Sequence, residues 1–167
     1  MLILPQMPIV HLHRDNLTIE KACLFMCGNN MFMVHASVGL LDQIKYIHAK
    51  LSQNGIKMVY RSDSAGYDSD IIEYCSNNNI TYYIRAKEFN SLKKEAYDLE
   101  YKNLTEEKQI SEFDYFLKGT PVRMIVTREK AETDLPLESY ENYRFIATNS
   151  NKSITNVYET YNDRGVC

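Results

Sequence analysis

Apolar residues in the first half of the chain alternate between helical stripes and short compact runs. Residues 37–53 carry apolar side chains at the three- and four-residue spacing of one helix face. The pair Asn54-Gly55 ends this stretch with residues that tolerate a left-handed backbone. A compact apolar run at 57–61 and a second helical stripe at 69–77 follow. We therefore expect a helix, a strand and a second helix in this order.

A further apolar run at 80–85 completes a strand–helix–strand rhythm. Such a rhythm predicts parallel neighbouring strands joined by a right-handed crossover. The run at 7–13 predicts another strand, whereas 18–26 suits either a helix or a strand. The first half of the chain therefore indicates an α/β fold.

The second half is more polar. Its pattern predicts helices over 90–103 and 153–162 and strands over 122–128 and 143–148. The acidic connection 129–141 contains a proline, so we expect a loop or a hairpin there. No internal repeat or sharp change of composition divides the chain, which predicts one domain.

Composition and charge narrow the possible function classes. The chain has 167 residues, 44% hydrophobic and 25% charged, which suits a globular domain with a real core. No apolar run reaches the roughly 20 residues that span a bilayer. Residues 1–10 lack the basic start and cleavage site of a signal peptide, so we expect a cytoplasmic protein. The net charge of −3 argues against strong, independent DNA binding.

The cysteine and histidine residues near the N-terminus raise the question of a zinc site. Cys23 and Cys27 could be combined with His11 and His13. Their spacing does not match common structural zinc patterns, and the cysteines lie in an apolar stretch. We expect buried, reduced cysteines instead.

The sharpest chemical candidate is Asp63, which directly follows a predicted strand. Ligands and metals gather at the carboxyl ends of strands in open α/β sheets, and a carboxylate there can bind Mg²⁺. Asp is also favoured as a cap before a helix, and spacing alone favours the cap. The nearby Asp68 and Asp70 suit capping of the next helix. No P-loop, dinucleotide fingerprint or nucleophile elbow adds a second chemistry.

Six segments, taken in order, resemble the insertion-sequence DDE transposases, and in particular the transposase DDE domain group 1 set. The segments are Cys27-Gly28-Asn29, Arg61-Ser62-Asp63-Ser64-Ala65-Gly66-Tyr67, Ile71-Ile72-x-Tyr74-Cys75, Ile80-x-Tyr82-Tyr83-Ile84-Arg85-Ala86, Val122-Arg123-Met124-Ile125-Val126-Thr127-Arg128 and Tyr161-x-x-Arg164-Gly165. The resemblance spans roughly residues 20–167. It implies an RNase H-like α/β fold: a mixed sheet flanked by helices, with a polar or β insertion at about 87–120 before the last helix. Residues 1–167 would then form a single partial catalytic domain with an incomplete core.

The resemblance also implies a reaction. The family cleaves and rejoins DNA with two Asp and one Glu that hold two divalent cations, Mg²⁺ or Mn²⁺. Asp63 corresponds to the second Asp, as catalytic residue and metal ligand, and Tyr161 and Arg164 are expected to contact DNA. The first Asp lies upstream of the matched segments, and the Glu is expected four residues after Arg164, one position past Cys167. We therefore expect one of three carboxylates and no strand transfer by this chain alone.

The expected partners are the DNA of transposon ends and a second copy in a homodimer, with no membrane. Two other functions stay open at this stage. The chain could be a non-catalytic remnant that binds DNA or a full-length transposase as an inhibitory module. It could also be an unrelated α/β nuclease, which requires a second carboxylate within about 4 Å of a metal at Asp63.

Overall fold

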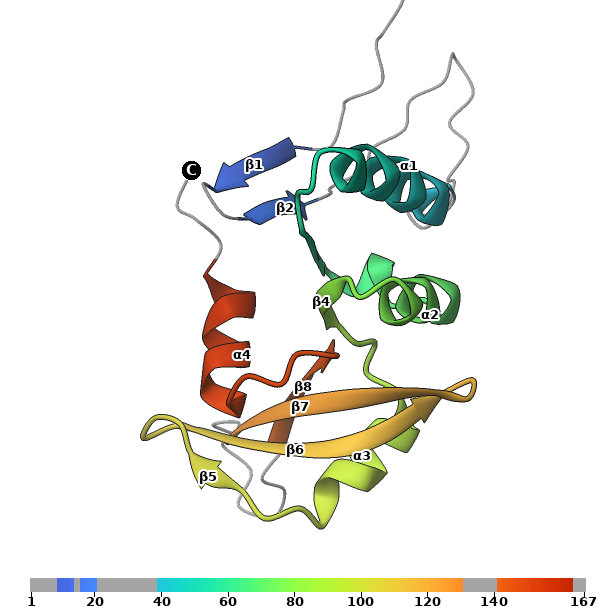
Figure 1. Cartoon of the computed structure of the whole chain (residues 1–167). Helices are drawn as coiled ribbons and strands as arrows, with labels where there is room; N and C mark the ends of the chain where they lie inside the picture. Colours follow the sequence, from blue (N-terminus) through green and yellow to red (C-terminus); the bar gives the residue numbers. More distant parts are fainter. Residues whose placement is uncertain (1–8, 14–15, 21–38, 131–140, 164–167) are drawn as a thin grey trace, which may run out of the picture.

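A computed structural model describes residues 9–13, 16–20, 39–130 and 141–163. Its strands are β1 (Ile9–His13), β2 (Asn16–Glu20), β3 (Met58–Ser62), β4 (Thr81–Arg85), β5 (Lys102–Asn103), β6 (Lys108–Leu117), β7 (Thr120–Lys130) and β8 (Glu141–Thr148). They form one eight-stranded sheet in the order β1-β2-β3-β4-β8-β7-β6-β5 (Figure 1). The sheet is mixed, as the α/β prediction requires.

The parallel part of the sheet follows the predicted rhythm. Strands β2, β3 and β4 are parallel neighbours, and helices α1 (Leu40–Gln53) and α2 (Ser69–Asn77) make the crossovers. Asn54 caps the end of α1, and Gly55 adopts the left-handed backbone, with φ of +68°. The structure confirms the two predicted helices in this half and the strands before and after α2. It also confirms that the first helix ends at the Asn54-Gly55 pair. The ambiguous stretch 18–26 is strand as far as Glu20, and its remainder lies outside the described residues.

The antiparallel part differs from the prediction in one helix. Helix α3 (Asn90–Tyr97) ends well before residue 103, and 102–103 form β5. The phenol of Tyr101 turns back to donate to the carbonyl of Ala96 at 2.8 Å, which fixes the chain after the helix end. Strand β6 pairs with β7 over its whole length, so the region expected as an insertion contributes to the same sheet.

Helices cover the two faces of the sheet unequally (Figure 1). Helices α1, α2 and α3 pack on one face, where their apolar residues join those of β3, β4, β7 and β8 in the larger core cluster. Helix α4 (Ile154–Asn162) covers the other face. Its Val157 and Tyr161 pack with Tyr83, Ile125 and Ile146 in a smaller cluster, as the predicted apolar stripe requires. No described helix is long and apolar enough to cross a membrane.

Candidate functional site

Asp63 lies at the carboxyl end of β3 and begins the short 3-10 turn η1 (Ser64–Gly66). Its Oδ1 accepts a hydrogen bond from the N–H of Ala65 at 2.9 Å. The capping interpretation is therefore confirmed, although the cap serves η1 and not α2. The side chain is exposed, and a carboxylate has acceptor sites beyond the one used here. Capping and metal binding are thus compatible at this residue.

A second cap follows directly and fixes the start of α2. Asp68 accepts from the N–H of Asp70 at 2.9 Å, and Asp70 lies in the first turn, where its charge suits the helix dipole. Both residues therefore have the capping roles that their spacing predicts. They also give a control for Asp63, because Asp68 makes the same kind of bond without lying at a strand end.

Gly66 holds η1 against β3 by close approach. A Cβ at this position would lie 2.6 Å from both the Cβ of Ser62 and the hydroxyl oxygen of Tyr60, and closer still to the Ser62 hydroxyl. The backbone of Gly66 is not left-handed, so the requirement for glycine is steric. Sequence reasoning missed this role; the only signal was a glycine three positions after the capping residue Asp63.

Arg61 connects the site to the C-terminal end of α4. Its Nη1 donates to the carbonyl of Thr160 at 3.0 Å and to that of Asp163 at 2.7 Å. Carbonyls at a helix C-terminus are free to accept and carry partial negative charge, which favours a guanidinium. Arg61 thereby anchors the C-terminal end of α4 to β3, directly before Asp63. Sequence reasoning did not assign this role to Arg61.

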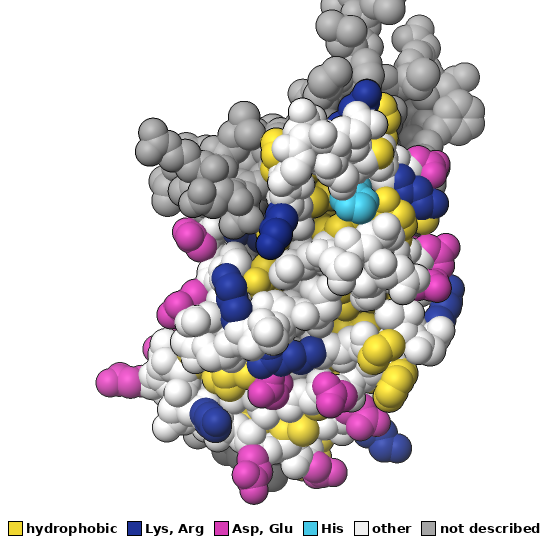
Figure 2. Space-filling view, viewed as in Figure 1, with side chains coloured by type: hydrophobic (Ala, Val, Ile, Leu, Met, Phe, Trp, Pro, Cys, Tyr) yellow, Lys and Arg dark blue, Asp and Glu magenta, His cyan; other side chains and the backbone are white. Residues whose placement is uncertain are grey.

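Arg85 adds a second cation at the same edge of the sheet. Ser62 pairs with Ile84, so the next position places the backbone of Asp63 beside that of Arg85, at the carboxyl ends of two parallel strands. The Arg85 side chain is 43% exposed and forms a long ion pair with Glu88, at 3.6 Å. Such a pair is worth little, so the guanidinium can exchange it for a phosphate. On the face seen in Figure 2, basic and acidic side chains are interspersed.

A group of buried phenols and one thiol lies beneath the site, and we call it the phenol cluster. It consists of Tyr60, Tyr67, Tyr82 and Cys75. Burial raises the pKa of each of the three phenols from 10.0 to about 12, and for Tyr60 the charge of the nearby Asp63 carboxylate adds to this effect. Burial likewise raises the pKa of the Cys75 thiol from 9.0 to about 12. All four groups are protonated at neutral pH, so none of them is a ready nucleophile or metal ligand.

The other predicted site residues have different outcomes. Tyr161 is only 6% exposed and packs α4 onto the sheet. Arg164 lies outside the described residues, as do Cys23 and Cys27. Among the residues that the structure describes, no three His, Cys, Asp or Glu side chains are grouped to hold a metal ion. Asp63 therefore has no pair of carboxylate partners within this part of the chain.

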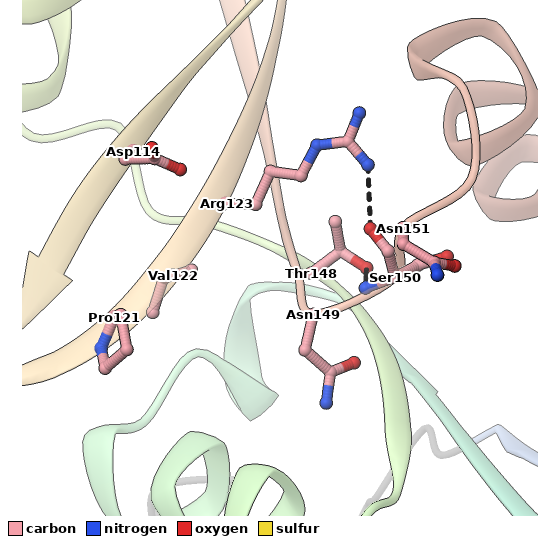
Figure 3. A pocket seen from close by; sticks show the side chains of 8 residues that line it. All are labelled: Asp114, Pro121, Val122, Arg123, Thr148, Asn149, Ser150 and Asn151. Carbon is pink, nitrogen blue, oxygen red and sulfur yellow. Dashed lines mark hydrogen bonds between the residues drawn. The ribbon is translucent and has the colours of Figure 1, made fainter.

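An open hollow of about 370 Å³ lies near the other end of β4 (Figure 3). Its polar side chains mostly hold the backbone. Arg123 donates to the carbonyl of Ser150 at 2.7 Å, and Thr148 donates to that of Tyr82 at 2.6 Å. Asn149 accepts from the N–H of Tyr82 and donates to the carbonyl of Ile80. The hollow thus belongs to the junction between β4, β8 and the start of α4.

Comparison of the sequence with protein-family models and with curated proteins finds no match. The candidate site therefore consists of the Asp63 carboxylate at the end of β3, the neighbouring Arg61 and Arg85, and the C-terminal end of α4, which Arg61 holds through two hydrogen bonds.

Proposed function

We propose that this chain is part of the catalytic core of a DDE transposase with an RNase H-like fold. The observation that carries the proposal is the pair of hydrogen bonds from Arg61 to the end of α4. In the family that the sequence resembles, the Tyr-x-x-Arg signature leads to the catalytic Glu, which holds the metal ions together with the two Asp. Here the helix that bears Tyr161 ends against the strand that leads to Asp63, which supports that arrangement.

In this proposal Asp63 binds a catalytic Mg²⁺ or Mn²⁺ ion through the carboxylate oxygens that the cap leaves open. Divalent ions activate the attacking oxygen and stabilise the leaving oxygen during phosphoryl transfer. Arg85 has a side chain that is 43% exposed and suits a DNA phosphate, as does Arg164 in the signature. Tyr161 was expected to contact DNA; its burial gives it the role of fixing α4 in place.

We expect no cleavage and no strand transfer by this chain alone. One carboxylate places a cation weakly, and in-line displacement at a phosphodiester needs both metal ions in position. We therefore propose that Asp63 acts together with two further carboxylates that the described residues do not supply.

A cleavage assay tests the proposal with a matched control. The substrate is terminal-repeat or nicked DNA with Mg²⁺ or Mn²⁺, and the protein is either this chain or the product of its complete reading frame. We expect no cleavage by this chain and metal-dependent cleavage by the longer product, lost in Asp63→Asn but kept in Asp68→Asn. Asn at 63 can still accept from Ala65, so its loss of activity would report the charge and not the cap. Cleavage that survives Asp63→Asn would contradict the proposal.

A second candidate function is a non-catalytic module that binds DNA or a full-length transposase. The observation that favours it is that Asp63 has no pair of carboxylate partners among the described residues. Its test is the coding DNA on either side of the chain. An Asp-bearing strand upstream and a Glu codon four positions after Arg164 support the enzyme, whereas stop codons or frameshifts there support the remnant.

A further inference from the structure

Arg123 on β7 holds the segment that enters α4. Its Nη1 donates to the carbonyls of Ser150 and Lys152, both at 2.7 Å (Figure 3). Lys152 directly precedes Ser153, whose side chain caps the first turn of α4 by accepting from the N–H of Asn156. The start of the helix is therefore tied to β7 through a single side chain.

Glu112 on β6 makes this place suitable for a cation. The N-terminal end of a helix carries partial positive charge, so a guanidinium near it is unfavourable by itself. The Oε2 of Glu112 offsets this cost, because it accepts from the Nε of Arg123 at 2.6 Å and also forms an ion pair with its Nη2. Contacts to two nitrogens also fix the plane of the guanidinium, and thus the direction in which Nη1 donates.

Packing alone defines the position of α4 along its axis only weakly. Of the nine residues of this helix, Val157 and Tyr161 are buried, and they lie one turn apart on the same face. The C-terminal end is held by Arg61, two residues before Asp63, through two backbone carbonyls. A helix of this length measures about 13 Å and is rigid, so a shift at its start also appears at its end.

We propose that Arg123, held by Glu112, is a positioning residue for the Asp63 site and acts through α4. Together with Arg61 at the other end, it fixes where the signature that begins at Tyr161 lies relative to Asp63. The inference rests on the proposed function for the chemistry at Asp63, whereas the placement of α4 can be measured without metal or DNA. Arg123 then affects turnover without contacting DNA.

A nitroxide label at residue 63 tests the placement of α4. Asp63→Cys is labelled in the full chain, with the cysteines at 23, 27 and 167 replaced by serine, and paramagnetic broadening of the α4 amide signals is measured. Because broadening falls steeply with distance, Arg123→Met should change it at least twofold at Tyr161 and Asn162. The α4 amides should keep their helical chemical shifts.

Two further variants separate placement from folding. Arg128→Met is the matched control and should leave the broadening unchanged, because Arg128 is on the same strand with its guanidinium over Tyr101 on the opposite face of the sheet. Glu112→Gln keeps Arg123 and removes only the charge beside it, so it should change the same signals by a smaller amount. Unchanged broadening in Arg123→Met, or an equal change in Arg128→Met, would overturn the inference. Loss of the helical shifts of α4 in both Arg123→Met and Glu112→Gln would do the same, since it would show a role in folding alone.

Turnover by the product of the complete reading frame supplies the second readout. Arg123→Met should lower kcat at least tenfold and leave KM for terminal-repeat DNA unchanged. Arg123→Lys should recover only part of kcat, because one ammonium group cannot reach Glu112 and both carbonyls at once. A raised KM with unchanged kcat would show that Arg123 binds DNA and would overturn the inference. The expected nitroxide result without any cleavage by the wild type would contradict the proposed function but support the placement of α4 by Arg123.

Discussion

Replacement of Gly66 by alanine is expected to destabilise the protein by about 2 kcal/mol. The new methyl group would lie 2.6 Å from the Cβ of Ser62 and 2.6 Å from the hydroxyl oxygen of Tyr60, well inside van der Waals contact. Overpacking of this kind costs about 1–3 kcal/mol. The Tyr60 hydroxyl can move at the end of its side chain, but the Ser62 Cβ is fixed to the strand. A typical gain of about 0.4–1 kcal/mol from reduced entropy of the unfolded chain offsets part of the cost.

Urea unfolding of Gly66→Ala measures this loss directly, provided that the dependence of the free energy on urea stays unchanged. The double variant Gly66→Ala with Ser62→Gly removes the fixed contact and should recover part of the loss relative to Ser62→Gly alone. Gly55→Ala is a matched control: it has open space around it but a left-handed backbone, so it should cost about 1 kcal/mol through strain and show no coupling to Ser62. A neutral or stabilising Gly66→Ala would refute the close-packing argument.

Three other predictions concern the connections around the site. Arg61→Met should lower the free energy of unfolding by about 2 kcal/mol, because two charge-assisted hydrogen bonds are lost. Amide exchange should become faster mainly in the last turn of α4, and an equal increase across the whole chain would argue against a local anchor. Thr148→Val should cost about 1–3 kcal/mol in urea unfolding, because the carbonyl of Tyr82 and the N–H of Ser150 lose their partner in the interior. The raised pKa values of the phenol cluster predict stability that is present below pH 9 and lost as pH rises from 9 through about 12, since the unfolded chain releases these protons first; the ¹³Cζ resonances of Tyr60, Tyr67 and Tyr82 in ¹³C-tyrosine-labelled protein should shift only on unfolding, and their titration in the folded state near pH 10 would contradict this.

The parallel half of the fold could be predicted because its signals are local. Helix α2 has its predicted bounds, since an Asp cap precedes it and asparagines close it. Helix α1 likewise ends at its Asn-Gly pair. These features depend on residues within a few positions of one another, which is the range over which a single sequence is informative.

The antiparallel half depends on distant partners and was predicted less well. Strand β6 looked polar because Glu112 and Asp114 face outward, while Phe113, Tyr115 and Leu117 face the core at every second position. Its assignment as a strand requires β7 alongside it. Helix α3 ends at Tyr97 and not at the predicted residue 103. The hydrogen bond from the Tyr101 hydroxyl to the Ala96 carbonyl holds the chain that follows, and helical periodicity does not predict such a bond.

In the candidate site, too, the features set by neighbouring residues could be predicted, and those set by distant residues could not. Asp63 could be located from sequence, because a strand, an acid and small residues follow one another directly. Arg61 acts on residues about a hundred positions away, and Gly66 is required by side chains on β3, so neither role is visible in local spacing. Tyr161 was expected on a DNA surface, and packing of α4 explains why it is buried.

The central claim is that Asp63 is a metal ligand as well as a cap. Titration of the ¹⁵N-labelled chain with Mn²⁺, with and without a short DNA duplex, measures paramagnetic broadening of each amide signal. We expect the amides of Ser64 and Ala65 to broaden first, more strongly with DNA, and to be spared in Asp63→Asn but not in Asp68→Asn. Broadening that is unchanged in Asp63→Asn, or that begins around Asp68, would contradict the claim.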